Sequence, residues 1–209
     1  MGMSVTRRRA MAALVVAGVL VAGLAWPGAA LGMQGAAQEG ARTFVGRVAG
    51  AEGLDALVAV VVGADGNAVV YTCSKDDAWN QANSKWFTGQ VGADGRLAAK
   101  AADGTEVAAT MAGGRLEGTL GTLRFVAEQV SGGSAGLYRG RAGDDVHAVI
   151  EAPDGTRVGR VWSVVTGAHV GTWDFNTAQV QWQPGVLAVE RAQPERFFIE
   201  LQVCTNAFC

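Results

Sequence analysis

The chain has 209 residues, which is enough for one domain with a sizeable core or for two small ones. Beyond residue 32 it carries 14 basic and 19 acidic residues, a net charge of −5, and no basic cluster offsets that charge, so nucleic acid is excluded as an expected partner. Its 30 glycines against 4 prolines indicate many tight turns between strands rather than disorder.

The N-terminus has the layout of a secretory signal. A basic triplet at 7–9 precedes an uncharged, apolar run over 10–26, and Pro27 ends that run. Small side chains near Gly32 predict cleavage there, so residues 1–32 are expected to be a signal peptide. The alternative is an uncleaved membrane anchor, but the run is at the short limit of the roughly 17–25 residues that a spanning helix needs.

Export leaves the mature chain outside the cytoplasm. We therefore expect a secreted or extracytoplasmic protein, in the cell envelope or periplasm, with no membrane span after signal cleavage. Thr6-Arg7-Arg8 resembles a twin-arginine signal without its usual apolar continuation, so the twin-arginine and the ordinary secretory routes both remain open. No cysteine lies near the cleavage point, which disfavours a lipid anchor.

Residues 33–42 have no pattern that could bury a face and are expected to be a flexible leader, and 43–209 form the predicted β domain. Asp-Gly pairs recur between apolar runs, and both positions of such a pair suit a hairpin turn. With the Gly-Gly pairs they predict strands near 43–49, 56–63, 67–73, 85–92, 96–101, 105–111, 114–120, 122–129, 136–141, 146–152, 156–165, 169–174, 178–183, 186–191 and 197–204. An alternative sub-boundary lies at 142–145, where glycine and paired aspartates interrupt the pattern.

The strands alternate as half-buried strands do. In 122–128, for example, Phe125 and Ala127 point one way and Arg124 and Glu128 the other. The segment from Ala56 to Val62 differs, because it is apolar at every position and must be covered on both sides. The predicted fold class is all-β: an antiparallel meander of hairpins that closes into a barrel, with a β-sandwich as the alternative.

Three cysteines lie in the exported part. In an oxidising compartment two of them are expected to pair, and the short spacing favours a bridge between Cys204 and Cys209. Pairing of Cys73 with either of the others remains open. Only His147 and His169 are available to help the cysteines hold a metal, and the spacing is not that of a zinc site, so neither a metal nor a cofactor is expected.

Aromatic residues mark the candidate ligand site. Trp79 lies in the polar segment from Asp76 to Ser84, which is expected to be a loop or a single helical turn. Trp86, Phe87, Tyr138 and Arg139 complete the set, since aromatics at a loop end can stack on a sugar ring or an apolar ligand. Burial of these aromatics in the core is the competing interpretation.

A catalytic alternative uses loop carboxylates. Asp76 or Asp77 with His147 would give a secreted hydrolase an acid and a base, but no nucleophile-elbow motif accompanies them. Both histidines are instead expected to be exposed structural residues. The glycine-rich segment 132–136 lacks the lysine of a phosphate-binding loop and is expected to be a turn.

Ala135-Gly136-Leu137-Tyr138-Arg139, together with Val69-Val70-Tyr71-Thr72-Cys73 and Lys85-Trp86-Phe87-Thr88-Gly89, resembles a group of exported bacterial β-domain proteins without assigned activity. The likeness spans about residues 43–160, implies the same architecture and carries no functional residues over. Gly171-Thr172-Trp173 is also similar to a triplet of streptavidin-like barrels, but the rest of their ligand-pocket pattern is missing.

The function expected from the sequence is that of an exported, non-catalytic binding or envelope-associated module. Its partner would be a small molecule, a glycan or an envelope component. Two alternatives are the secreted hydrolase and a structural or assembly component, in which the apolar strand or the glutamines at 179, 181 and 183 would pair with another chain.

Overall fold

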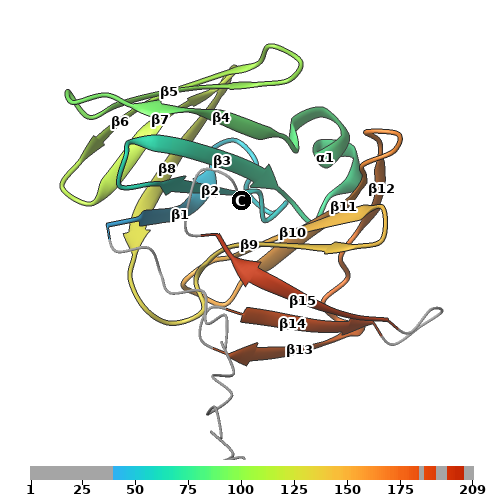
Figure 1. The fold of residues 1–209 in the computed structure, drawn as a ribbon. Coiled ribbons are helices and arrows are strands. Elements are labelled where there is room, and N and C mark those ends of the chain that lie inside the picture. Colours follow the sequence, from blue (N-terminus) through green and yellow to red (C-terminus); the bar gives the residue numbers. More distant parts are fainter. Residues whose placement is uncertain (1–39, 184–185, 192–196, 205–209) are drawn as a thin grey trace, which may run out of the picture. The chain divides into compact units, whose positions relative to one another are not determined.

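The computed structural model describes residues 40–183, 186–191 and 197–204. It is an all-β structure with one short helix, α1 (Asp77–Asn83) (Figure 1). The first eight strands are β1 (Arg42–Val48), β2 (Leu57–Val62), β3 (Asn67–Cys73), β4 (Trp86–Val91), β5 (Arg96–Ala101), β6 (Glu106–Ala112), β7 (Arg115–Leu120) and β8 (Leu123–Val130). The other seven are β9 (Gly136–Ala142), β10 (Asp145–Glu151), β11 (Arg157–Ser163), β12 (His169–Thr172), β13 (Ala178–Gln183), β14 (Val186–Arg191) and β15 (Phe197–Val203).

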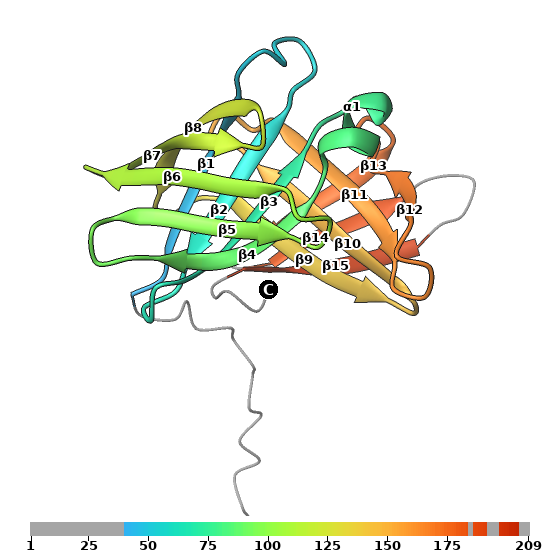
Figure 2. The same ribbon diagram turned by 90° about the horizontal axis from the view of Figure 1, so that it is seen from above.

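Strands β1 to β8 form a closed antiparallel barrel in sequence order (Figure 2). β8 pairs back onto β1, with Phe44 opposite Gln129 and Gly46 opposite Ala127, so the barrel has no open edge. Its interior is filled by side chains, among them Phe44, Phe87 and Phe125, which are 0–1% exposed. The barrel is therefore a packed core and supplies a scaffold.

The hairpin turns are built by aspartate and glycine together. At each predicted Asp-Gly turn the aspartate Oδ1 accepts a hydrogen bond from the backbone N–H two residues on; from Asp94 to Arg96, for example, the distance is 3.1 Å. The glycine takes a left-handed conformation, with φ of +76° at Gly95. The same arrangement recurs at Asp65, Asp103 and Asp154.

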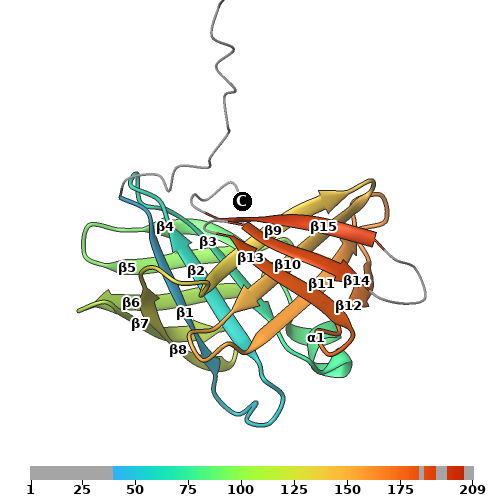
Figure 3. The same cartoon turned by 90° about the horizontal axis from the view of Figure 1, so that it is seen from below.

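The remaining strands form a seven-stranded sheet in the order β12-β11-β10-β9-β15-β14-β13 (Figure 3). The hairpin order is broken once, where the last strand, β15, pairs with β9 through Val203 opposite Tyr138. The sheet curls around a core of its own that contains Tyr138, Val149, Leu187 and Leu201. The predicted barrel thus closes after eight strands, and the rest of the chain makes a second sheet.

A third core lies between the barrel wall and the second sheet. It joins Leu57, Ala59 and Tyr71 of the barrel to Leu137 and Ile150 of the sheet. Alternate residues of β2 face this core or the barrel interior, so all six are buried. The expectation that the apolar segment is covered on both sides is confirmed, and both covers come from this chain.

The predicted signal peptide (1–32) and most of the leader lie outside the described residues. Regular structure begins at Arg42, one residue before the predicted start of the β domain. The chain passes from the barrel to the second sheet at 131–135, whereas 142–145 spans the turn between β9 and β10. No helix in the described part of the chain is long and apolar enough to cross a membrane.

Candidate functional site

The site begins with the loop that carries α1, which lies beside β12 (Figures 1 and 3). Asp76 caps the helix, since its Oδ1 accepts a hydrogen bond from the backbone N–H of Trp79 at 2.6 Å. The fully buried Asn80 side chain makes two hydrogen bonds to the backbone of Ser74, each 2.8 Å long. These contacts fix the loop and so fix the direction of Asp77.

A cavity of about 440 Å³ opens between this loop and the second sheet. We call it the junction pocket. Its lining comprises Lys75, Asp77, Gly155, Thr156, Arg157, Thr172, Trp173, Asp174, Phe175 and Asn176. The volume is within the range of small-molecule sites, about 300–1,000 Å³.

Several polar side chains of the junction pocket are held by partners. Lys75 Nζ lies 2.7 Å from Asp55 Oδ2, and Arg157 Nε donates to Glu151 Oε2 at 2.7 Å. Asp77 Oδ1 accepts the Thr172 hydroxyl at 2.5 Å. Both cations of the pocket are therefore paired with carboxylates, whereas the partner of Asp77 is a neutral hydroxyl.

An aromatic pair completes the wall. The rings of Trp173 and Phe175 stack with centroids 6.0 Å apart and planes 23° apart. Trp173 is 4% exposed and packs in the core of the second sheet, while Phe175 is partly buried. Asp174 lies between them, and its Oδ1 accepts the N–H of Asn176 at 2.9 Å, which holds the turn in shape.

Behind the pocket wall lies a buried guanidinium. Arg160 is 0% exposed, sits opposite Thr172 in the sheet and packs on Trp162, with 5.0 Å from its Cζ to the ring centroid. None of its three nitrogens has a hydrogen-bond partner among the described residues. Its charge and burial both lower the pKa of His169, burial being the larger cause.

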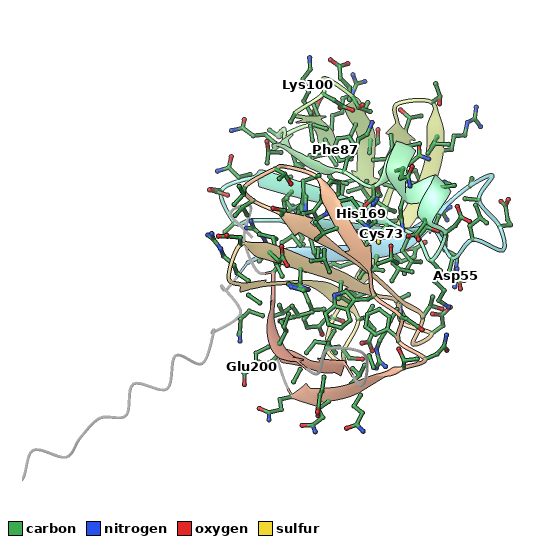
Figure 4. The ribbon with its side chains drawn as sticks, turned by 90° about the vertical axis from the view of Figure 1, so that its right-hand side faces the viewer. Asp55, Cys73, Phe87, Lys100, His169 and Glu200 are labelled. Carbon is green, nitrogen blue, oxygen red and sulfur yellow. The ribbon has the colours of Figure 1, made fainter. Side chains whose placement is uncertain are left out.

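Tyr71, Cys73 and Asp77 act on Arg160 from the barrel side, and of these the thiol and the phenol are held in their neutral forms. Burial raises the pKa of the Cys73 thiol to about 12 and that of the Tyr71 hydroxyl well above its usual value. Figure 4 shows Cys73 and His169 near the centre of this view and Asp55 at its right-hand edge. A thiol held in this protonated form is unreactive as a nucleophile.

The structure brings two of the predicted ligand residues together. Arg139 of β9 lies over the ring of Trp86 of β4, 5.6 Å from its centroid, and Trp86 stacks on Tyr71 with centroids 4.4 Å apart. Burial and the nearby Arg141 lower the pKa of Arg139. This stack joins the two sheets and lies apart from the lining of the junction pocket.

The other predicted ligand residues pack in cores. Phe87 is 1% exposed inside the barrel, and Trp79 packs against that same core. Tyr138 is 2% exposed in the second sheet, and its hydroxyl donates to the Ser134 carbonyl oxygen at 2.6 Å. For these three residues the observed environment is that of core packing.

The expectation that both histidines are exposed is wrong. His147 is 3% exposed, because its side of β10 faces the inside of the curled sheet, where the ring lies 5.5 Å from Trp173. His169 is partly buried, and its Nε2 is 2.6 Å from the Gly171 carbonyl oxygen. That contact requires a proton on Nε2, so this nitrogen cannot take the proton of the Thr172 hydroxyl 3.4 Å away.

The predicted Cys204–Cys209 bridge involves Cys209, which lies outside the described residues. Cys73 is a buried free thiol, which contradicts its alternative pairing with Cys204 or Cys209. Within the described ranges no group of three or more His, Cys, Asp or Glu side chains is arranged to hold a metal ion.

Sequence reasoning missed the pocket residues that follow β12. Asp174, Phe175 and Asn176 line the cavity together with Trp173. The available signal was an aspartate turn with an aromatic on each side, the same turn chemistry that marked the hairpins. No glycine follows Asp174, so the Asp-Gly signal that marks the hairpins is absent there.

No known protein family and no curated protein matches the chain. Among solved structures it is similar to the β subunit of the DNA polymerase of Streptococcus pyogenes, with a TM-score of 0.14 and 8% identity. The match covers 78% of this chain and 57% of that one, so the chain spans less than two thirds of the length of its structural neighbour. At this TM-score the likeness bears on neither fold nor function.

Proposed function

We propose that the chain is an exported, non-catalytic binding module that holds an uncharged polar ligand, of the saccharide class, in the junction pocket. The observation that carries the proposal is the pairing of both lining cations, Lys75 and Arg157, with carboxylates of the protein, beside a stacked aromatic pair. Neither cation is free for an anionic ligand, and the lining carboxylates Asp77 and Asp174 can accept hydrogen bonds from ligand hydroxyls. Fixed polar groups and an aromatic edge suit hydroxyls and a sugar ring.

Export and a Cys204–Cys209 disulfide belong to the same proposal. The basic, apolar and small-residue sequence of 1–32 supports secretion. The free state of Cys73 leaves Cys204 and Cys209 as the pair for an oxidising compartment.

The proposal is tested by calorimetric titration of the mature protein with maltose, cellobiose and chitobiose. Asp174→Asn removes a charged acceptor from the pocket but keeps an oxygen for the turn, and should weaken binding of the accepted sugar about tenfold. Asp94→Asn changes a turn of the same chemistry on the barrel and is the matched control. Equal affinities for the two variants, or no binding of any of the three sugars by the wild-type protein, would refute the proposal.

The two other expected functions give different results in the same samples. A hydrolase would convert the sugar during the titration, which chromatography of the mixture detects. An assembly component would form larger species with rising concentration, which sedimentation detects. The binding module should return intact sugar and sediment as one species.

A further inference from the structure

A second cavity lies across the β10–β11 turn from the junction pocket. It measures about 450 Å³ and is lined by 129–135, Glu151, Ala152, Pro153 and Gly155. We call it the loop pocket. Its rim is the glycine-rich connection between the barrel and the second sheet, and its floor includes Glu151, whose side chain is 2% exposed.

The two pockets are connected through shared residues. Gly155 lines both of them. Arg157 lines the junction pocket, and its ion-pair partner Glu151 lines the loop pocket. Glu151 also accepts a hydrogen bond from Ser134, so its charge is compensated and the loop pocket offers mainly neutral hydrogen-bonding groups.

The surface between the pockets is open. A Cβ atom built at Gly155 would meet nothing within 4 Å, and the same holds at Gly132 and Gly133 on the rim. The side chains on each side of Gly155 are held by Arg47, which donates to Asp154 at 2.8 Å and to Thr156 at 3.3 Å. Arg47 thus holds the side chains of Asp154 and Thr156. Gly155 between them has no side chain, so the surface between the two pockets stays open.

We infer that the junction pocket and the loop pocket are two ends of one extended site, which binds a linear chain of uncharged sugar units that crosses the turn at Gly155. The inference rests on the proposed function and specifies its ligand as a polymer. Lys75 and Arg157 are paired with carboxylates and no cation among the described residues lines the loop pocket, so neither end offers a free cation to an acidic polymer, and a neutral chain fits both. A chain that fills both pockets buries more surface than a short sugar, but it loses translational and rotational freedom only once. Affinity should therefore rise with chain length.

The test is calorimetric titration of the mature protein with malto-, cello- and chito-oligosaccharides of two and of six units. Wild-type protein should bind the six-unit form of the accepted series at least tenfold more tightly than the two-unit form. Ser131→Trp places a bulky side chain on the exposed rim of the loop pocket and should abolish this advantage while leaving two-unit binding unchanged. Gln90→Trp, on an exposed position of β4, is the control and should behave as wild type.

The possible results distinguish a failure of the extended site from a failure of the proposed function. Asn176→Trp obstructs the junction pocket and should weaken binding of both lengths. Equal affinity for two and six units, or a length advantage that survives Ser131→Trp, would overturn the extended site and leave the junction pocket as a site for a small sugar. An absence of binding for every series would overturn both.

Discussion

Two arginines of β11 differ in whether their positive charge is paired with an acceptor. Arg157 pairs with Glu151, which is almost fully buried, whereas Arg160 is 0% exposed with no acceptor among the described residues. A guanidinium does not lose its proton, so Arg160 carries the cost of burial without the compensation that Arg157 receives. Substitution to methionine should therefore destabilise the fold at Arg157 but not at Arg160.

Arg160→Met should leave the free energy of unfolding unchanged or raise it by about 1–2 kcal/mol, because it replaces a buried charge that has no hydrogen-bonded acceptor among the described residues by an apolar chain of similar length. Arg157→Met should lower it by about 3–5 kcal/mol, because Glu151 would be left buried without its cation. Urea denaturation of both variants measures the difference. A loss of more than about 1 kcal/mol in Arg160→Met would show that the guanidinium is bound by an acceptor.

At the scale of residues, the sequence predicted the chemical character of the side chains better than it predicted which of them contact each other. The sequence places Trp86 and Arg139 in one candidate ligand site, and the two side chains do contact each other, although 52 positions separate them. Trp173 and Asp77 were not linked, because the pocket forms only where the end of β12 meets the helix loop. Burial of His147 could not be foreseen either, since both faces of β10 are covered once the sheet curls.

At the scale of elements, local patterns predicted all fifteen of the described strands. The aspartate turns set the hairpins, and the alternation in β8 placed Phe125 and Ala127 in the core as expected. These features depend on neighbours in sequence, so a single chain reveals them. Three glycines inside barrel strands carry further information, because a side chain there would collide with the adjacent strand.

Gly118 of β7 shows this close approach. A Cβ atom there would lie 2.1 Å from the Ala108 carbonyl oxygen, a distance that real Cβ contacts essentially never reach. Similar contacts of 1.8 Å and 2.0 Å occur at Gly46 and Gly89. Gly118→Ala should lower the free energy of unfolding by about 2–3 kcal/mol, since the backbone must shift within a closed barrel.

The control for Gly118→Ala is Gly171→Ala on β12, where a Cβ atom would meet nothing within 4 Å. This variant should stay within about 0.5 kcal/mol of wild type. Thermal and urea unfolding of both variants make the comparison. Equal stability of the two would mean that the barrel strands separate more easily than their packing indicates.

At the scale of the molecule, the division into a barrel and a second sheet depends on two long-range pairings. β8 returns to β1, and the last strand inserts beside β9. Both require segments far apart in the chain to meet, and the hairpin signals were identical on either side of 131–135. The sequence therefore predicted a meander and a barrel, but not the point at which the barrel closes.

The contact between barrel and second sheet also has a polar rim that should respond to acid. Arg47 of β1 is bound to Asp154 in the β10–β11 turn and to Asp55, which also pairs with Lys75. Hydrogen bonds from Thr156, followed by Arg47, lower the pKa of Asp154 to about 2, and Lys75 lowers that of Asp55. Both carboxylates therefore favour the folded state above their unfolded pKa of about 4.

That contribution is complete above about pH 5 and is lost as the pH falls toward 2, because the folded form must then take up protons that the unfolded form has already bound. The side chains of Asp154 and Asp55 are 56% and 33% exposed, so solvent screens their ion pairs. The loss of stability per carboxylate should therefore be under about 1 kcal/mol. Urea unfolding between pH 5 and pH 2 should show it as a fall in stability that Arg47→Met reduces. If Arg47→Met kept the full wild-type pH dependence, Arg47 would contribute nothing to acid sensitivity, and Thr156 and Lys75 alone would lower the pKa values of Asp154 and Asp55.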